Sequence, residues 1–275
     1  KPGYYGSVKV GADTFGGYQA SGNINYSSSK IDAYANLSHR SREMDGGGIT
    51  KRQNTLDNSF LNQTNESERH NKNWFGRVGA TWHITKSDDL ALNMTGMSGG
   101  GDNEQKILYH SIDGQSNTVY TSDRNTLSDS DMKMYNVELN YRHKFSENSD
   151  IDVMVSNNQW RMDGMNIYQQ STSYTDPNKT TDPVYQTQKN KNRNKTWEVQ
   201  ADYTNKIGDI ARIEAGYKGV FQRNESPVDT YSGTNATDLK QDQLLYNRFF
   251  YNQDVHALYL TYGGKWNNFS YQAGV

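Results

Sequence analysis

The strongest constraint on this chain is a strict alternation of two kinds of residue between Met132 and Val155. Aliphatic and aromatic-ring residues alternate with Asn, Glu, Arg and Lys. The first set comprises Tyr135, Val137, Leu139, Tyr141, His143 and Phe145. A short polar turn at 146–149 follows, and the alternation resumes with Ile151 and Val153. A period of two predicts β-strands with one apolar and one polar face. The stretch is therefore interpreted as a β-hairpin.

The same alternation recurs along the chain and predicts an all-β protein. Strands are expected over 6–12, 18–26, 31–40, 77–84, 90–94, 132–145, 151–156, 197–204, 211–221, 255–266 and 269–275. Between these segments the pattern dissolves, which predicts long loops over about 43–73, 99–130, 163–194 and 224–252. Pro177, Pro183 and Pro227 fall in these loops, where a proline removes no hydrogen bond from a strand ladder.

Loop lengths alternate in a regular way. The short turns begin near residues 27, 86, 146, 206 and 267, about 60 residues apart, and long loops separate them. The first outer turn, at 13–17, is a short exception. Long loops on one side and tight turns on the other are typical of bacterial outer-membrane barrels. We therefore expect an up-and-down antiparallel transmembrane β-barrel located in the bacterial outer membrane, with residues 1–275 forming one domain.

Charged residues fall on one side of the alternation. In the well-patterned strands the apolar set contains no Asp, Glu, Lys or Arg. One Arg or Lys facing lipid near the midplane costs ~2–4 kcal/mol, so the charges are expected to face a lumen. The lumen-facing residues that we single out are Arg77, Glu138, Arg142, Glu198, Asp202, Arg212 and Glu214.

Aromatic residues gather beside the short turns. Such positions suit an interfacial aromatic girdle, because amphipathic rings prefer the membrane–water boundary. The girdle residues that we single out are Tyr26, Trp82, Phe145, Tyr203 and Trp266. A soluble antiparallel sheet explains the alternation equally well. It explains neither the aromatic positions nor the alternation of loop lengths, so it is kept as an alternative.

Composition narrows the classes of function. The mean hydropathy is −1.01, and no apolar run approaches the roughly 18 residues of a membrane helix. Barrels escape such scans because only alternate residues face lipid. With 29 Lys+Arg against 31 Asp+Glu, the chain has no general attraction to nucleic acid. The absence of cysteine excludes thiolate metal sites and cysteine nucleophiles.

No catalytic, cofactor or metal site is predicted. The six histidines are scattered without the spacing of metal ligands. Asp129-Ser130-Asp131 resembles the start of a calcium loop, but the glycine and glutamate of that motif do not follow. Asn-, Asp-, Tyr- and Ser-rich loops could contact a glycan or a peptide, although hydrated outer loops have the same composition.

Several segments resemble the barrel of TonB-dependent outer-membrane receptors of the type found in Bacteroidota. The resemblance rests on the segments 1–6 (KPGYYG), 17–26 (GYQASGNINY), 139–145 (LNYRHKF) and 269–275 (FSYQAGV). The similarity lies in the residue pattern of the whole chain and not in one sharply defined motif.

The resemblance implies a 22-stranded barrel that contacts outer-membrane lipid and holds an N-terminal plug. Energised by TonB, such a receptor imports a large or scarce nutrient without catalysis. This chain shows ten strands and the start of an eleventh, with no plug and no segment for TonB. It is therefore expected to be the N-terminal half of a larger barrel wall. The first alternative is a complete small barrel acting as a passive pore, adhesin or structural protein; the second is a soluble β-rich binding module.

The two faces can be tested with neighbouring residues of one strand. Val137→Arg puts a charge on the predicted lipid side, whereas Glu138→Gln changes a polar position, so only the former should impair membrane assembly. Heat-modifiable migration after refolding into detergent measures this. Equal behaviour of the two variants would favour the soluble sheet.

Overall fold

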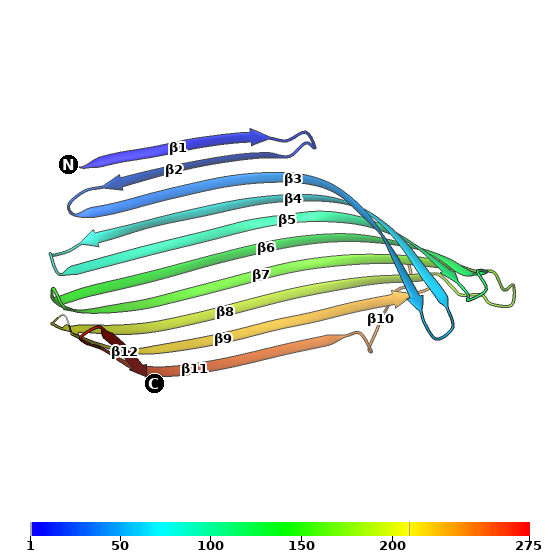
Figure 1. Cartoon of the computed structure of the whole chain (residues 1–275). Coiled ribbons are helices and arrows are strands. Elements are labelled where there is room, and N and C mark those ends of the chain that lie inside the picture. Colours follow the sequence, from blue (N-terminus) through cyan, green and yellow to red (C-terminus); the bar gives the residue numbers. More distant parts are fainter. Residues whose placement is uncertain (1, 209) are drawn as a thin grey trace.

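The computed structural model describes residues 2–208 and 210–275 as one antiparallel sheet of twelve strands (Figure 1). Lys1, in the first segment of the resemblance, and Asp209, in an expected short turn, lie outside the described residues. The strands are β1 (Gly3–Ala12), β2 (Tyr18–Ser27), β3 (Ile31–Asn54), β4 (Ser59–His83), β5 (Asp88–Ile112), β6 (Thr118–Ser146), β7 (Ser149–Tyr174), β8 (Val184–Ile207), β9 (Ala211–Gly233), β10 (Lys240–Gln241), β11 (Asn247–Trp266) and β12 (Phe269–Gly274). Each long strand pairs with its neighbours in sequence, and β10 is a two-residue addition to β9. The all-β, up-and-down antiparallel fold is confirmed.

The register places the apolar residues in continuous rows across the strands. Leu139 of β6 lies opposite Leu92 of β5 and Val155 of β7. Val155 in turn faces Val199 of β8. Because side chains alternate strictly along a strand, this register gathers the apolar residues of the expected strands on one face. We call these rows the apolar band.

The apolar band is not covered by a second layer. Leu92 is 44% and Leu139 45% exposed, and Ile107 is the one buried large hydrophobic side chain among the described residues. A soluble sheet protects its apolar face by packing it against another layer. This exposed band is what a sheet surrounded by lipid requires, and it speaks against the soluble alternative.

The prediction of four long loops is wrong over most of their length, because the strands continue there. Residues 43–54 and 59–73 extend β3 and β4, and residues 99–112 and 118–130 extend β5 and β6. Much of 163–194 and 224–252 is likewise strand, although 175–183 and 234–239 are loops. Apolar alternation reports a difference between the two faces of a strand. It disappears where both faces meet water, even though the backbone ladder continues.

Pro227 lies in a strand and not in a loop. It is part of β9, opposite Arg248 of β11. On the other side of β9 the ladder with β8 passes from Asn190↔Val228 to Arg193↔Glu225 without the pairs between them. The proline has no N–H to donate, so the ladder is interrupted where it stands. Pro177 and Pro183 do lie in the loop between β7 and β8.

The five expected short turns lie at one end of the sheet, and the extended hairpins project from the opposite end, where the short β1–β2 turn also lies (Figure 1). Short turns join β2 to β3, β4 to β5, β6 to β7, β8 to β9 and β11 to β12 at one end. The other end carries the projecting hairpins β3–β4 and β5–β6 and the loop after β7. Segments starting at Glu43 and Asp163 therefore extend toward the same end, as expected.

The long strands are more than twice as long as a membrane crossing needs. A tilted strand crosses the hydrocarbon core with about 9–11 residues. In β8 that length is taken up between Trp197 and Ile207, and residues 184–196 continue beyond it. The outer parts of β3–β9 therefore form a polar extension of the sheet beyond the apolar band. No helix capable of crossing a membrane occurs among the described residues.

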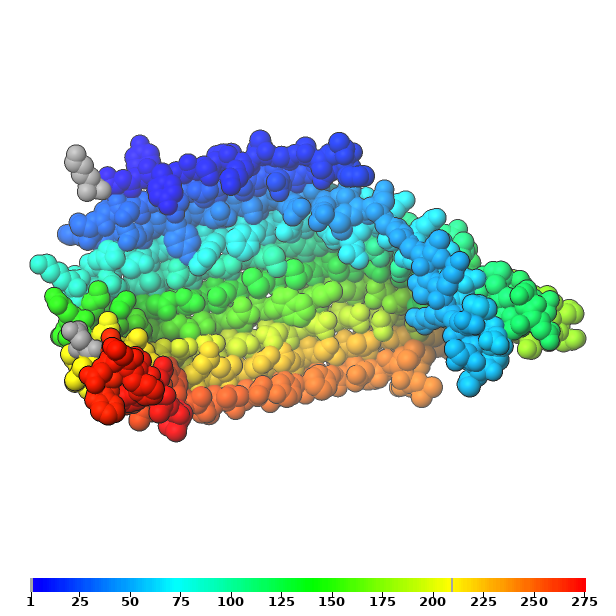
Figure 2. Space-filling model, viewed as in Figure 1, coloured from blue at the N-terminus to red at the C-terminus, as the bar shows by residue number. Residues whose placement is uncertain are grey.

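The sheet is curved but not closed. β1 pairs with β2, and β12 pairs with β11, so both outer edges of the sheet remain open. The face shown in Figure 2 is hollowed between β1 at one edge and β11–β12 at the other. Among the described residues, the segment 7–12 pairs with β2 and not with β11.

Hydrogen exchange should distinguish the projecting strands from loops. Amides of 62–68 and 104–110 should exchange slowly, because the first stretch pairs with both β3 and β5 and the second with both β4 and β6, whereas residues 175–183 have no ladder. Exchange in detergent, followed by mass spectrometry, measures this. Equally rapid exchange of all three segments would contradict the extended hairpin.

Candidate functional site on the polar face

The predicted lumen-facing charges share the face opposite the apolar band. Arg77 of β4 lies in the row of Asn36 and Thr95. Glu138 of β6 lies in the row of Asn93 and Ser156. Glu198, Asp202, Arg212 and Glu214 belong to the corresponding rows of β8 and β9. We call this surface the polar face.

Several charges on the polar face are paired with a charge of opposite sign. Lys218 Nζ lies 2.5 Å from Glu198 Oε1, bridging β9 and β8. Arg212 contacts Glu214 at 2.5 Å along β9. Arg142 of β6 reaches Asp150 of β7 at 2.8 Å. The polar face therefore combines both signs of charge.

A hydrogen-bonded network crosses four strands of the polar face. The Tyr34 hydroxyl of β3 donates to Asn93 Oδ1 of β5 at 2.9 Å. Asn93 Nδ2 donates to Glu138 Oε1 of β6 at 3.4 Å, and Asn140 Nδ2 donates to the same oxygen at 2.6 Å. The Arg77 guanidinium lies over the Tyr34 ring, 5.3 Å from its centroid. This network connects two of the predicted charges, Arg77 and Glu138.

Glycines on the intervening strands make room for the tyrosines of this face. Tyr34 reaches Asn93 across Gly79 of β4, where an added Cβ would lie 2.6 Å from the Tyr34 ring. Tyr259 of β11 lies in the same way over Gly216 of β9, beside Asp202. Tyr259 interrupts the polar pattern of its strand, and this packing explains why a large ring is accommodated there.

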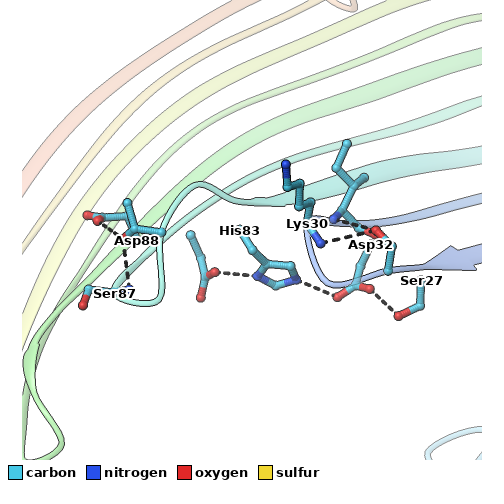
Figure 3. A network of polar contacts seen from close by, with 10 residues as sticks. Ser27, Lys30, Asp32, His83, Ser87 and Asp88 are labelled. Atoms are coloured by element: carbon cyan, nitrogen blue, oxygen red, sulfur yellow. Dashed lines mark hydrogen bonds and ion pairs between the residues drawn. The ribbon is translucent and has the colours of Figure 1, made fainter. Parts of the chain in front are cut away.

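A histidine cluster lies at the short-turn end of the polar face (Figure 3). His83 Nε2 is 2.9 Å from Asp32 Oδ2 of β3, and His83 Nδ1 is 2.6 Å from Asp89 Oδ1 of β5. Ser27 also hydrogen-bonds to Asp32, at 2.5 Å. The sequence showed no metal-ligand spacing at His83 and gave no sign of these contacts. Only the strand register reveals this cluster, because it brings His83, Asp32 and Asp89 together from three strands.

The outer turns carry their own capping interactions. Asp113, between β5 and β6, accepts hydrogen bonds from the backbone N–H groups of Asn117 at 2.8 Å and Gln115 at 2.9 Å. The Asn117 amides, the backbone N–H first, hold the pKa of Asp113 below its usual range. A lowered folded-state pKa means that this stabilisation is present above the ordinary carboxyl pKa and is lost as the pH falls through the lowered value.

The aromatic residues singled out from the sequence all lie near short turns. Tyr26 stands near the end of β2, Trp82 near the end of β4 and Phe145 near the end of β6. Tyr203 and Trp266 lie toward the same end of β8 and β11, and Trp266 is 75% exposed. Tyr203 also accepts a hydrogen bond of 3.1 Å from the Ser149 hydroxyl. Their part in an interfacial girdle remains a prediction.

The polar face suits contact with polar surfaces rather than chemistry on a substrate. In residues 2–208 and 210–275, no group of three or more His, Asp or Glu side chains has the arrangement of a metal site. Its hydrogen bonds and ion pairs connect neighbouring strands. The arrangement can therefore stiffen the sheet and present a polar wall.

Comparison with known families adds a finding on the second half of the chain. Residues 143–275 match the outer membrane protein beta-barrel family. This match and the uncovered apolar band place the protein in the bacterial outer membrane. The match begins at His143, at the end of the first arm of the hairpin whose alternation is strongest, and it covers all later strands. A search of curated proteins gives no match.

Solved structures resemble the outer-membrane protein only distantly. The ferric yersiniabactin uptake receptor FyuA from Yersinia pestis has 11% identity and a TM-score of 0.33, and the match covers 97% of this chain but 45% of the receptor. The alcaligin receptor FauA from Bordetella pertussis has 9% identity and a TM-score of 0.17, covering 97% of this chain and 66% of that one. A BenF-like porin from Pseudomonas fluorescens has 6% identity and a TM-score of 0.15, covering 93% and 97%. The likenesses do not separate a receptor from a porin.

Two glycine substitutions test the polar network. Gly79→Ala puts a methyl group against Tyr34 and Asn93 and should destabilise the sheet by about 1–3 kcal/mol. Gly96→Ala is the matched control, because no atom lies within 4 Å of its added Cβ. The urea midpoint in detergent measures both. Equal midpoints would contradict a required crossing of Tyr34 over Gly79.

Proposed function

We propose that this chain forms part of the barrel wall of a TonB-dependent outer-membrane receptor. In this proposal the complete receptor takes up a large or scarce nutrient, of glycan or peptide type, and carries out no catalysis. A plug domain fills the lumen, and TonB supplies energy from the periplasmic side. The chain belongs to the lipid-facing wall of that barrel.

The observation that carries the proposal is the direction of the strands at the two open edges. Eleven strands follow one another along the sheet, each antiparallel to its neighbour, so β1 and β12 run in the same direction. Two parallel strands cannot close an all-antiparallel barrel. Open sheet edges are not tolerated in lipid, because their backbone groups would be unsatisfied. Further strands between β12 and β1 would satisfy both edges.

The polar face supports a filled lumen over an ion-selective pore. Selective pores carry rings of charge of one sign, whereas Lys218–Glu198 and Arg142–Asp150 are paired with opposite signs at 2.5 and 2.8 Å. A lumen occupied by a plug needs a wall with both signs and with hydrogen-bonding groups. In the proposal, Arg77 and Glu138 belong to this wall, and the aromatic residues near the short turns form the periplasmic girdle.

Engineered disulfides test whether the chain closes on itself. Because the chain has no cysteine, a pair at Ser7→Cys and Tyr259→Cys reports contact of β1 with β11. Ser7→Cys with Asn23→Cys is the control, since these residues are register partners. The proposal expects oxidation to join only the control pair in membranes. A disulfide between positions 7 and 259 would indicate a small closed barrel.

Conductance separates the receptor from the passive pore. The protein extracted from membranes and inserted into planar bilayers in KCl should show no stable open channel, because a receptor lumen is filled by its plug. A passive barrel instead conducts continuously. Steady single-channel conductance would overturn the receptor proposal in favour of a pore.

A further inference from the structure

A cluster of basic side chains lies directly beside the apolar band at its outer border. The last row of the band runs through Val137, Asn157, Trp197 and Phe221. The next row on the same face contains Lys195 and Arg223, which lie opposite each other on β8 and β9. The row beyond it contains Lys133, Arg161 and Arg193 on β6, β7 and β8. We call these five residues the basic border.

The sequence of β8 shows the same feature along one strand. Residues 189–197 read KNKNRNKTW, so four basic residues alternate with polar ones and lead directly to Trp197. In a strand, alternate residues lie on one face. Lys189, Lys191, Arg193 and Lys195 therefore stand on the face of Trp197, while the asparagines lie on the other. The charge is thus concentrated on the face that carries the apolar band.

The basic border surrounds a groove of about 620 Å³. Aromatic and amide groups complete its lining, among them Tyr135, Gln159 and Phe250. The groove borders the apolar band, since Tyr135, which lines it, is followed on the same face of β6 by Val137 of the band. A polar head could lie among the cations while its apolar tail extends over the band.

Part of this charge is neutralised, and part is available. Asp163 lies 2.7 Å from Arg193 and 2.6 Å from Arg161, and Asp254 lies 2.5 Å from Arg223. Within the described residues, Lys133 and Lys195 of the basic border have no carboxylate at ion-pair distance, and neither has Lys191 in the next row outward. Glu225 also lines the groove. The cations still exceed the carboxylates at the border.

The sign of charge changes farther from the band. On the same face, the rows beyond the basic border include Asp131, Asp163 and Asp129 on β6 and β7, besides Lys191. Positive charge is therefore most concentrated at one height, directly beside the apolar band. A surface that merely kept the protein soluble would have no reason to place its cations at this level.

We propose that the basic border binds the phosphate groups of phosphorylated lipids in the outer leaflet of the outer membrane. The inference rests on the placement of the apolar band toward lipid and of the long hairpins outside the cell. Anionic headgroups attract basic residues near the membrane surface, and lysine ammonium groups bind phosphate as point charges. A lipid satisfies both neighbouring surfaces at once, because its acyl chains cover the band. A free phosphate satisfies only one.

Lipid binding by the full chain tests the proposal. Native mass spectrometry from detergent compares diphosphoryl lipid A with monophosphoryl lipid A, which carries one phosphate fewer. The wild-type chain should bind the diphosphoryl form more tightly, and added salt should weaken this preference. No difference between the two lipids would overturn the proposal.

Neutralising variants locate the binding site. Lys133→Gln/Lys191→Gln/Lys195→Gln should weaken binding of diphosphoryl lipid A about tenfold or more. The matched control, Lys51→Gln/Arg52→Gln/Lys179→Gln, removes the same charge from exposed positions near the outer tips and should bind like wild type. Lys133→Arg/Lys191→Arg/Lys195→Arg should also retain binding. Equal losses of binding in the Lys133/Lys191/Lys195 glutamine variant and in the control variant would overturn the assignment.

Competition with inorganic phosphate shows whether the basic border binds a membrane lipid or a free phosphate anion. It should compete weakly with diphosphoryl lipid A, because it cannot contact the apolar band. Competition as strong as that of the lipid would overturn binding of a membrane lipid in favour of a free anion. The lipid result is independent of barrel closure, since the Ser7–Tyr259 disulfide pair does not involve these residues.

Discussion

The hydrogen-bonded ladder between neighbouring strands is the interaction on which the whole structure depends. In the described residues there is one sheet and no second layer, so no packed core supports the strands from either side. Backbone groups surrounded by lipid must find their partners within the protein. Cross-strand pairing from β1 to β12 supplies these partners. The open edges are the places where this requirement is unmet within the sheet.

Register gives the ladder its functional meaning. A shift by one residue would send every apolar side chain to the opposite face. With the observed register, the apolar band, the polar face and the basic border each become a continuous surface built from several strands. The Tyr34–Asn93–Glu138 network and the His83 cluster depend on it equally, since each joins residues from three strands.

The surroundings of the sheet change along the length of its strands. Around Leu139 one face is apolar and the other polar, as lipid and an aqueous interior require. In the outer parts of β3–β9 both faces are polar, and the same ladder continues into water. The basic border lies at the junction of the two regions, where Lys195 lies next to Trp197 on one face of β8. The strands thus continue beyond the membrane, and the same sheet forms the outer surface of the protein.

The sequence by itself determined the fold class, the membrane-spanning strands, the division into two faces and the positions of the short turns, because lipid imposes alternation on every strand that it contacts. It failed for 43–73 and its counterparts, and for Pro227, because alternation vanishes where water meets both faces. Only the tertiary structure decided which residues meet across strands. His83 and Asp32 are separated by 51 positions in sequence, and only the register places their side chains within hydrogen-bonding distance. The same holds for Lys133, Arg161 and Arg193. They lie on three different strands, and only the register places them in one row.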